Sequence, residues 1–389
     1  MTPAPAPSGA QAADALQRGD FATARAMFQA IVDAGRGDAS VRLGLALSAL
    51  GAGDPAAATA AADDVLAREP SNLRATLVKA DAQEALGQSR AAMTFYTAVA
   101  NLAPEPDRYP PAAAAEIRRA MAARDRLNAA FEGHIRAHLA GLGLDPERDS
   151  SRFAASLEML MGRRQRYEQQ PRAYYLPELP NTGFFPRERF DWIERLEAAT
   201  PAIRAEAEAM LADPSVFAPY IEAEAERAAV RPGAVLNHNL GKDDWSACYL
   251  MKDGAPVEAN AGRCPATMAA LADIPLEHVP GRAPFALFSV LKPGAWIAPH
   301  TGFLNTRLVV HLPLIVPDGC WFRVGGDIRL WEEGRAWVFD DSIEHEARNQ
   351  GKGVRTILIF NIWRPDLSEV ERALVAGLFE AVDRFGTGS

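Results

Sequence analysis

The sequence predicts a multidomain α+β protein in which helical repeats precede a jelly-roll domain with flanking helices. The first third of the chain is rich in alanine and leucine with helical periodicity, and it repeats every 34 residues. From about residue 235 the pattern changes to short strands broken by Gly, Pro and Asn. Strands at such spacing are typical of a sandwich or jelly roll.

Length and composition set limits on function. A chain of 389 residues has room for two or three domains, and 48% hydrophobic residues allow substantial cores. The formal charge of −9 argues against a general nucleic-acid partner. The three cysteines form no C-x-x-C pair, which indicates a reducing compartment. We see neither a signal peptide nor a membrane span, and therefore expect a soluble, cytoplasmic protein.

Glycine, alanine and proline mark the 34-residue period: Gly19, Gly53 and Gly87; Ala24, Ala58 and Ala92; Pro70 and Pro104. This pattern resembles tetratricopeptide repeats, in which a small residue sits at the helix contact. An unrelated alanine-rich helical bundle is the alternative. We expect a disordered leader at 1–10, repeats at 11–104 whose concave surface suits a peptide or partner protein, and a helical connector at 105–169.

The predicted jelly-roll domain spans 170–372 and begins with a turn-rich segment around Tyr174–Pro180. A helix containing Trp192 and Ile203 follows. The expected strands include Phe285–Leu291, Arg307–Ile315, Ala336–Phe339 and Val354–Trp363. A last helix begins near Leu367 with Ser368 as its N-cap, and residues 373–389 complete this helix and the C-terminal tail.

Four polar residues on short apolar strands indicate where the chemistry lies. His300, His311, His345 and Arg355 are costly to bury without partners. A metal and an anionic co-substrate would satisfy all four. Neutral imidazole is the commonest protein ligand for first-row transition metals.

A turn centred near Gly351 predicts a hairpin in which His345 lies across from residues 355–357. A dicarboxylate bound to a metal on His345 would then place its far carboxylate on Arg355, whose guanidinium fork suits that group. The alternative is a structural ion pair between Arg355 and either Asp340 or Glu346.

The strand Arg307–Ile315 alternates, so Arg307, Val309 and His311 share one face. Non-haem iron dioxygenases usually carry a carboxylate two residues after their first histidine ligand. This sequence has Gly302 there. Either two histidines hold the metal with water and co-substrate, or a carboxylate comes from elsewhere, with Asp341 and Glu346 as the candidates.

The motifs between residues 174 and 372 resemble those of the aspartyl/asparaginyl β-hydroxylases. The matching segments are the Tyr-Leu-Pro-Glu-Leu-Pro sequence at 175–180, Lys-Pro-Gly before Pro-His-Thr-Gly, Asn-Thr-Arg before His-Leu-Pro-Leu, Trp-Glu-Glu-Gly at 331–334, Phe-Asp-Asp-Ser at 339–342, Glu-His-Glu at 344–346 and Ile-Trp-Arg-Pro-Asp-Leu at 362–367. Together they are highly specific, whereas each alone is weak.

The resemblance implies an iron(II)- and 2-oxoglutarate-dependent dioxygenase on a double-stranded β-helix, and it assigns roles to residues of this sequence. They are His300 and His345 for the metal; Arg355 and Ser289 for the distal 2-oxoglutarate carboxylate; His311 near the metal-side carboxylate; and Trp245 as a wall of the pocket. Val309 stands where animal members have a second co-substrate arginine, which removes one contact. Arg307 is the next candidate for binding the anion.

The predicted reaction is hydroxylation of an unactivated C–H bond with O2, giving succinate and CO2 as co-products. The resemblance implies the β-carbon of an Asp or Asn residue in a peptide or protein. Alternatives are a small-molecule or lipid acyl-chain hydroxylase, a halogenase that exploits the space at Gly302, and a non-catalytic repeat scaffold with a degenerate barrel.

Overall fold

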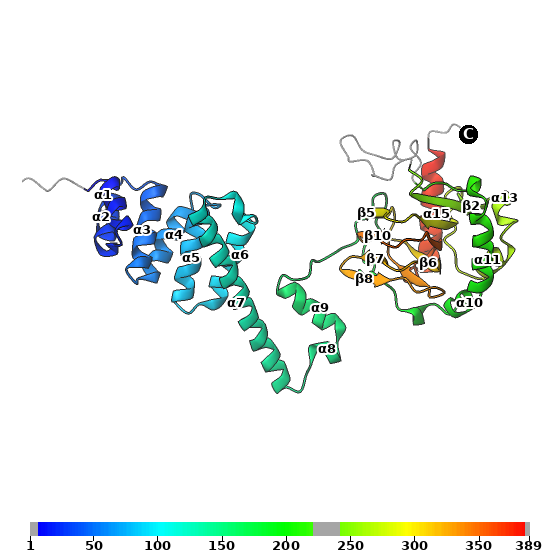
Figure 1. Ribbon diagram of the computed structural model, residues 1–389, viewed down its shortest axis with the longest axis horizontal. Helices are drawn as coiled ribbons and strands as arrows, with labels where there is room; N and C mark the ends of the chain where they lie inside the picture. The colour runs from blue at the N-terminus through cyan, green and yellow to red at the C-terminus, as the bar shows by residue number, and fades with distance from the viewer. Residues whose placement is uncertain (1–6, 221–241, 386–389) are drawn as a thin grey trace, which may run out of the picture. The chain divides into compact units, whose positions relative to one another are not determined.

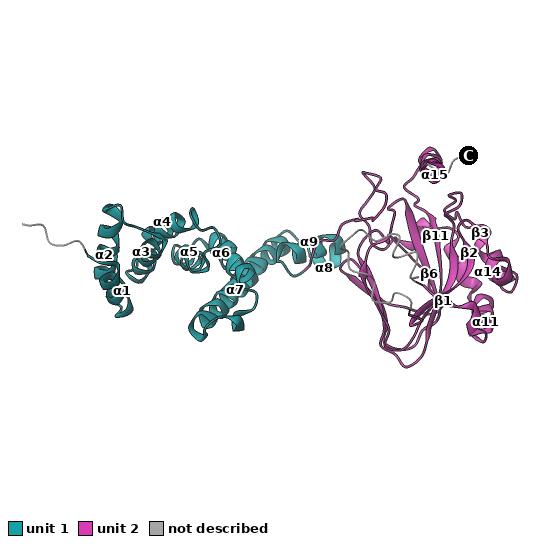
Figure 2. Cartoon of the chain, turned by 90° about the horizontal axis from the view of Figure 1, so that it is seen from above, with its two compact units in different colours: residues 1–163 teal, residues 164–389 magenta. Residues whose placement is uncertain are grey.

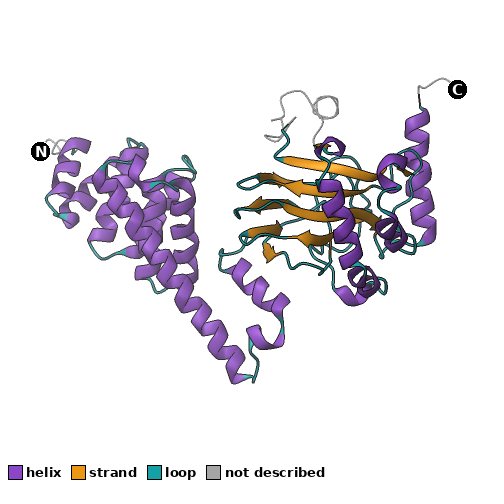
Figure 3. Cartoon of the chain, turned by 45° about the vertical axis from the view of Figure 1, so that its right-hand side comes forward, coloured by secondary structure: helices purple, strands orange, loops and turns teal. Residues whose placement is uncertain are grey.

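The computed structural model describes residues 7–220 and 242–385. The chain divides into two compact units, Met1–Arg163 and Arg164–Ser389 (Figure 2). The described part of unit 1 is helical, and unit 2 contains the strands, with helices beside them (Figure 3). A helical region followed by antiparallel sheets is the arrangement that the sequence predicts.

Unit 1 is a series of antiparallel helices (Figure 1). They are α1 (Gly9–Gln17), α2 (Phe21–Asp33), α3 (Ala39–Gly51), α4 (Pro55–Leu66), α5 (Leu73–Ala85), α6 (Ser89–Leu102), the 3-10 turn η1 (Pro106–Arg108), α7 (Pro111–Gly141), α8 (Pro146–Asp149) and α9 (Ser151–Leu160). The three period-marking glycines follow α1, α3 and α5 at φ of 76°, 79° and 71°. Because this backbone region favours glycine, the repeated turn explains the repeated residue.

The alanines at the same spacing are completely buried between paired helices: Ala24, Ala58 and Ala92. The structure therefore shows a 34-residue helical repeat. The predicted leader at 1–10 extends too far, because α1 begins at Gly9. Ser8 caps α1, since its hydroxyl accepts from the backbone N–H of Gln11 while the Gln11 side chain accepts from that of Ser8. Residues 1–6 lie outside the described part.

Unit 2 contains two antiparallel sheets. The larger runs β1-β2-β4-β11-β6-β9 with β3 beside β2, and the smaller runs β5-β10-β7-β8. The strands are β1 (Ala218–Pro219), β2 (Trp245–Lys252), β3 (Ala255–Pro256), β4 (Ala286–Leu291), β5 (Trp296–His300), β6 (Arg307–Ile315), β7 (Cys320–Val324), β8 (Asp327–Leu330), β9 (Trp337–Phe339), β10 (His345–Asn349) and β11 (Arg355–Trp363). This is the two-sheet arrangement of a jelly roll.

Alternation along the central strands divides the interior of unit 2 into two layers. Leu308, Val310 and Leu312 of β6 face a core shared with helices. They are α10 (Ile193–Ala198), α11 (Thr200–Leu211), η3 (Pro214–Val216) and α14 (Pro265–Leu271). Unit 2 also contains η2 (Arg187–Arg189) and α13 (Glu258–Ala261). Val309 faces the other way, into a second apolar cluster that joins the two sheets. The residues that alternate toward the second sheet are therefore the ones that line the site described below.

The predicted hairpin between His345 and Arg355 is wrong. His345 begins β10 and pairs with His300 of β5 and Val324 of β7 in the smaller sheet, whereas β11 pairs with β4 and β6 in the larger one. The segment between them crosses from sheet to sheet. Asn349 supports this crossing, since its amide donates to the carbonyl oxygens of Leu291 and Gly353, both at 2.9 Å. His345 and Arg355 thus face each other from different sheets.

The last helix confirms its predicted start. α15 (Glu369–Arg384) follows Ser368, whose hydroxyl accepts from the backbone N–H of Glu371 in a reciprocal capping box. Among the described residues, no helix combines the length and apolar character that crossing a bilayer demands.

Candidate active site

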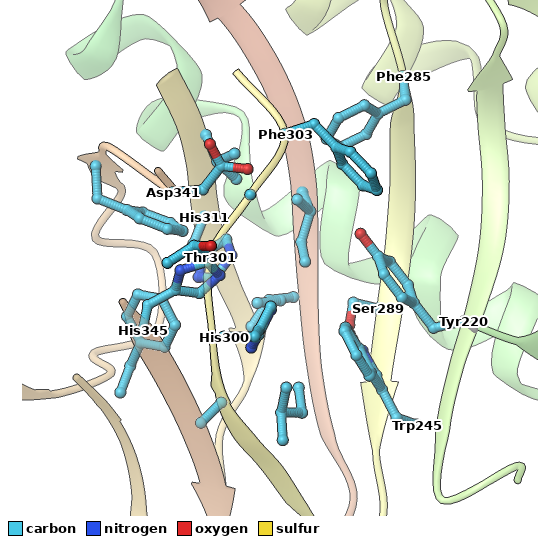
Figure 4. A pocket seen from close by; sticks show the side chains of 18 of the residues that line it. Tyr220, Trp245, Phe285, Ser289, His300, Thr301, Phe303, His311, Asp341 and His345 are labelled. Carbon is cyan, nitrogen blue, oxygen red and sulfur yellow. Dashed lines mark hydrogen bonds between the residues drawn. The ribbon is translucent and has the colours of Figure 1, made fainter. Parts of the chain in front are cut away.

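One cavity of about 280 Å³ lies between the two sheets of unit 2 (Figure 4). Both sheets and the loops beside them supply its walls, which include aromatic, aliphatic and ionisable side chains. The structure brings together in it the residues to which the resemblance assigned the metal or co-substrate, and also Arg307: Trp245, Ser289, His300, Arg307, His311, His345 and Arg355. Of the two candidate carboxylates, Asp341 lines the cavity and Glu346 does not.

His300 and His345 lie side by side on neighbouring strands. They are register partners at the ends of β5 and β10, and their ring centroids are 4.2 Å apart. Nδ1 of His300 donates to the carbonyl oxygen of Ala298 (2.8 Å), and Nδ1 of His345 to that of Ile343 (3.0 Å). Because a carbonyl oxygen only accepts, each Nδ1 carries the proton and each Nε2 keeps its lone pair.

Both imidazoles are held neutral. Burial, with the neighbouring His345 ring as a smaller cause, lowers the pKa of His300 to about 3. Burial also lowers the pKa of His345 to about 4. Two adjacent neutral imidazoles with oriented lone pairs fit a first-row transition metal. Within residues 7–220 and 242–385, no group of three His, Cys, Asp or Glu side chains is arranged to hold a metal.

Gly302 has no room for a carboxylate. A Cβ added there would lie 2.2 Å from Oδ2 of Asp341, because the Asp341 carboxylate fills that space. Oδ1 of Asp341 is buried and has no hydrogen-bond partner in the described structure. The other candidate carboxylate, Glu346, is committed elsewhere: it accepts from Arg323 and from Nε1 of Trp296.

Arg355 is the largest charged side chain buried in the cavity wall, with 1% of its surface exposed. Its Nε and Nη1 have no hydrogen-bond partner in the described structure. Burial lowers the pKa of Arg355 to about 9. The alternative ion pairs do not form, because Asp340 pairs with Arg364 (2.6 Å) and Glu346 pairs with Arg323. An unpaired buried guanidinium in a cavity is a site for an anion.

Ser289 and Trp245 form the wall beside Arg355. Ser289 lies on β4 opposite Ile357, and its Oγ accepts from Nε1 of Trp245 (3.1 Å). The Trp245 ring stacks on Tyr220, with centroids 3.9 Å apart and an interplanar angle of 11°. Since the Ser289 hydroxyl already accepts one bond, its own proton is available to the cavity.

His311 faces the same space from β6. It packs against Phe339 and Phe322, with ring centroids 4.7 and 5.0 Å away. Burial, with a smaller contribution from the Arg355 charge, lowers the pKa of His311 well below its usual value. Its buried Nδ1 has no hydrogen-bond partner among the described residues. His311 is thus a neutral ring with an unused nitrogen in the cavity.

Arg307 is paired, in contrast to Arg355. Its Nη2 donates to Oδ2 of Asp341 (3.1 Å), and its Nη1 lies 3.9 Å from Oε2 of the buried Glu277. Burial raises the pKa of Glu277, and Arg307 opposes that shift. Arg307 therefore lies in the cavity as predicted, but with its charge already engaged.

Several cavity residues escaped the sequence interpretation, and three of them make ring contacts at the site. Tyr220 stacks on Trp245, Arg172 stacks over Phe303 at the cavity edge (4.4 Å), and Trp331 packs against Arg355 (5.0 Å). Trp331 belongs to a segment that the sequence analysis quoted, so motif membership was a usable signal. Tyr220 and Arg172 stand in segments with no periodicity or motif that would indicate them.

The family profile described as aspartyl/asparaginyl β-hydroxylase matches residues 197–365. Over 218 residues the chain is 32% identical to aspartate β-hydroxylase domain-containing protein 2 of Homo sapiens. The aligned region covers 54% of this chain and 55% of that protein. It is 36% identical over 132 residues to human aspartyl/asparaginyl β-hydroxylase, covering 34% of this chain and 17% of that one.

A bacterial relative carries a different description. The chain is 31% identical over 191 residues to the ornithine lipid ester-linked acyl 2-hydroxylase of Rhizobium tropici, covering 48% of this chain and 63% of that protein. The chain spans about half the length of the curated relatives that it first matches, 55% in the case of domain-containing protein 2 from Xenopus tropicalis. The matched region contains all of the predicted site residues.

Proposed function

Because this chain belongs to the aspartyl/asparaginyl β-hydroxylase family through residues 197–365, we propose that it is an iron(II)- and 2-oxoglutarate-dependent dioxygenase. The observation that carries the proposal is the buried, unpaired Arg355 in the same cavity as the neutral pair His300 and His345. A metal site alone would not require the guanidinium, and an anion site alone would not require two oriented imidazoles.

In this proposal five of the cavity residues bind the metal or the co-substrate. His300 and His345 hold the iron through Nε2. Arg355 binds the far carboxylate of 2-oxoglutarate, and the Ser289 hydroxyl donates to the same group. His311 contacts the carboxylate nearer the metal. Once bound, iron and 2-oxoglutarate supply the oxidising chemistry with O2, and succinate and CO2 are the co-products.

The walls exclude water from the reacting centre. Trp245 and Tyr220 stack against each other on one side, and Phe322 and Phe339 pack around His311 on the other. A dry cavity strengthens the contact between Arg355 and a carboxylate, because the effective dielectric constant falls.

We propose the β-carbon of an Asp or Asn residue in a peptide or protein as the position hydroxylated. Two relatives whose names include aspartate or asparaginyl β-hydroxylase support this substrate class. The helical repeats of unit 1, if tetratricopeptide-like, would offer such a polypeptide a second surface. The second candidate is a lipid acyl chain, which the name of the Rhizobium relative favours.

Two other readings have less support. The space at Gly302 that a halogenase would need is filled by the Asp341 carboxylate. A degenerate scaffold would not be expected to keep a buried, unpaired arginine, because leaving such a group unsatisfied costs stability.

Succinate formation tests the proposal. The wild-type protein should produce succinate from 2-oxoglutarate only when iron(II) is added. His300→Ala and His345→Ala should each abolish tight iron binding and turnover, since no third His, Cys, Asp or Glu in the described structure compensates. His134→Ala, at an exposed position on α7, is the matched control and should behave as wild type. Near-wild-type iron affinity in either site variant would show that the ligands are wrong.

A further inference from the structure

The C-terminal helix α15 has a second apolar face that its own unit leaves uncovered. Val375 and Phe379 are buried against Trp363 and Val279. Five other apolar residues are between 42% and 90% exposed, and we call them the apolar stripe: Val370, Leu374, Leu378, Val382 and Phe385. α15, red in Figure 1, carries the stripe along its length to Phe385 just past its end.

The stripe is continuous along the helix. Residues four apart advance by about 40° around a helix, so the stripe and the small residues Gly377 and Ala381 fall on one face about 140° wide. One acidic side chain, Glu371, falls within this face in the first turn of the helix, where it is held in the capping box with Ser368. Asp383 is paired with Arg282, which lies on the domain, so its charge is directed away from the stripe.

We propose that the apolar stripe is the docking surface for α15 of a second copy of this chain, in an antiparallel pair. The four helical residues read Val-Leu-Leu-Val at equal spacing, and this order is the same in both directions. A two-fold axis near residue 376 therefore places Val370 against Val382 of the second copy and Leu374 against its Leu378. Isologous contacts of this kind are the commonest in homo-oligomers.

The centre of the stripe favours close approach. A Cβ added at Gly377 would meet nothing within 4 Å, so its backbone is open to a neighbour. A helix of 16 residues is about 24 Å long, so two such helices bury several hundred Å² on each side, below the roughly 800 Å² per partner of a standard interface. The structure thus predicts a weak dimer that depends on protein concentration.

The charge of α15 disfavours an anionic membrane as the occupant. The helix carries four acidic and two basic residues, and the whole chain has a formal net charge of −9. Amphipathic helices that lie on anionic bilayers are instead rich in lysine and arginine. A second copy meets the centre of the stripe, Leu374 and Leu378, through apolar contacts, because the charged residue on this face, Glu371, lies in the first turn of the helix.

Sedimentation equilibrium of the full chain over a concentration series tests the dimer, which does not depend on the proposed enzymatic activity. The wild-type protein should show a monomer–dimer equilibrium with a dissociation constant on the order of micromolar. Leu374→Glu should weaken the dimer at least tenfold. Ala373→Glu is the matched control, since it adds the same side chain at an exposed neighbour outside the stripe, and it should dimerise as wild type does.

A charge pair tests the antiparallel arrangement. The double variant Leu374→Glu/Leu378→Arg puts opposite charges in contact across the axis and should restore dimerisation. The double variant Leu374→Glu/Leu378→Glu puts like charges in contact there and should remain monomeric. A wild-type protein that is monomeric at every concentration would overturn the proposal. So would dimerisation of Leu374→Glu at wild-type strength, or a monomer that binds neutral phosphatidylcholine vesicles through the stripe.

Discussion

In the proposed function, the residue Arg355 sets the choice of ligand. It stands at the start of β11 and reaches the cavity floor, where Trp331 packs on its guanidinium at 5.0 Å. The protein holds this charge without a carboxylate partner in the described structure. Such a site binds a carboxylate that arrives from outside more favourably than it stays empty.

Replacing Arg355 with Ala should raise the apparent KM for 2-oxoglutarate about ten- to hundredfold. A charge-assisted contact to a partly buried anion contributes roughly 1.5–3 kcal/mol, which corresponds to that factor. Arg355→Lys should recover only part, because an ammonium cannot reproduce the guanidinium fork. Succinate production titrated against 2-oxoglutarate at saturating iron is the measurement. Iron affinity should barely change, and an unchanged co-substrate dependence would make Arg307 the next candidate.

The buried histidines predict how stability depends on pH. Burial lowers the pKa of His345 to about 4 and that of His311 well below its usual value, whereas in the unfolded chain both titrate near 6.5. Between about pH 6.5 and 4 the unfolded chain therefore binds more protons, and the free energy of unfolding falls as pH falls. Each such histidine contributes a slope of roughly 1.4 kcal/mol per pH unit in this window.

Chemical denaturation of the metal-free protein at several pH values measures that slope. His311→Gln removes one titrating group, so its stability should fall less steeply than that of the wild type between pH 6.5 and 4. Parallel curves for the two proteins would mean that His311 is protonated in the folded state.

At the scale of single elements, two contacting positions in the repeats of unit 1 differ in side-chain size from one repeat to the next. Phe28 packs where a Cβ on Gly44 would lie only 2.4 Å from its ring. Thirty-four residues later the same two positions hold Ala62 and Val78, which pack together in one cluster. A large residue facing glycine in one repeat is thus replaced by a small residue facing valine in the next.

Gly44→Val should lower the free energy of unfolding of unit 1 by roughly 1–3 kcal/mol, because the core there is already filled by Phe28. Adding Phe28→Ala should recover part of the loss, since the double variant recreates the pair of the second repeat. Thermal or urea unfolding measures both. The control is Gly133→Ala in α7, where no atom lies within 4 Å of the added Cβ. It should raise stability by up to about 1 kcal/mol. A harmless Gly44→Val would contradict the packing account.

Alternation along a strand predicted which side chains share a face, but not which strand lies beside it. β6 has the predicted bounds, and Arg307, Val309 and His311 line the cavity together. The hairpin failed because the segment after Asn349 leads into the other sheet, a choice made by contacts distant in sequence. Motifs indicated the cavity residues that we propose for the co-substrate, whereas Tyr220 enters the cavity through its non-local stacking on Trp245.

At the scale of the whole molecule, the site and its supporting cores belong to unit 2. Every proposed site residue follows Arg164, and the clusters that surround the cavity contain unit 2 residues only. A truncated protein of residues 164–389 should therefore fold, bind iron(II) and decarboxylate 2-oxoglutarate without substrate. Activity on a macromolecular substrate should fall, because the repeat surface is missing.

Circular dichroism, iron binding and succinate assays on this truncated protein make the comparison. A soluble, folded truncation that fails to bind iron would show that unit 1 completes the site. Full activity on a polypeptide substrate would show that the repeats serve another purpose.

The most direct test of the site is an anaerobic crystal structure of the full chain with manganese(II), as a redox-stable substitute for iron(II), and 2-oxoglutarate. The account predicts one metal on Nε2 of His300 and of His345, with the far carboxylate of 2-oxoglutarate bound by Arg355 and the Ser289 hydroxyl. A metal that binds away from either histidine would contradict it, as would a 2-oxoglutarate that leaves Arg355 unpaired and binds Arg307 instead.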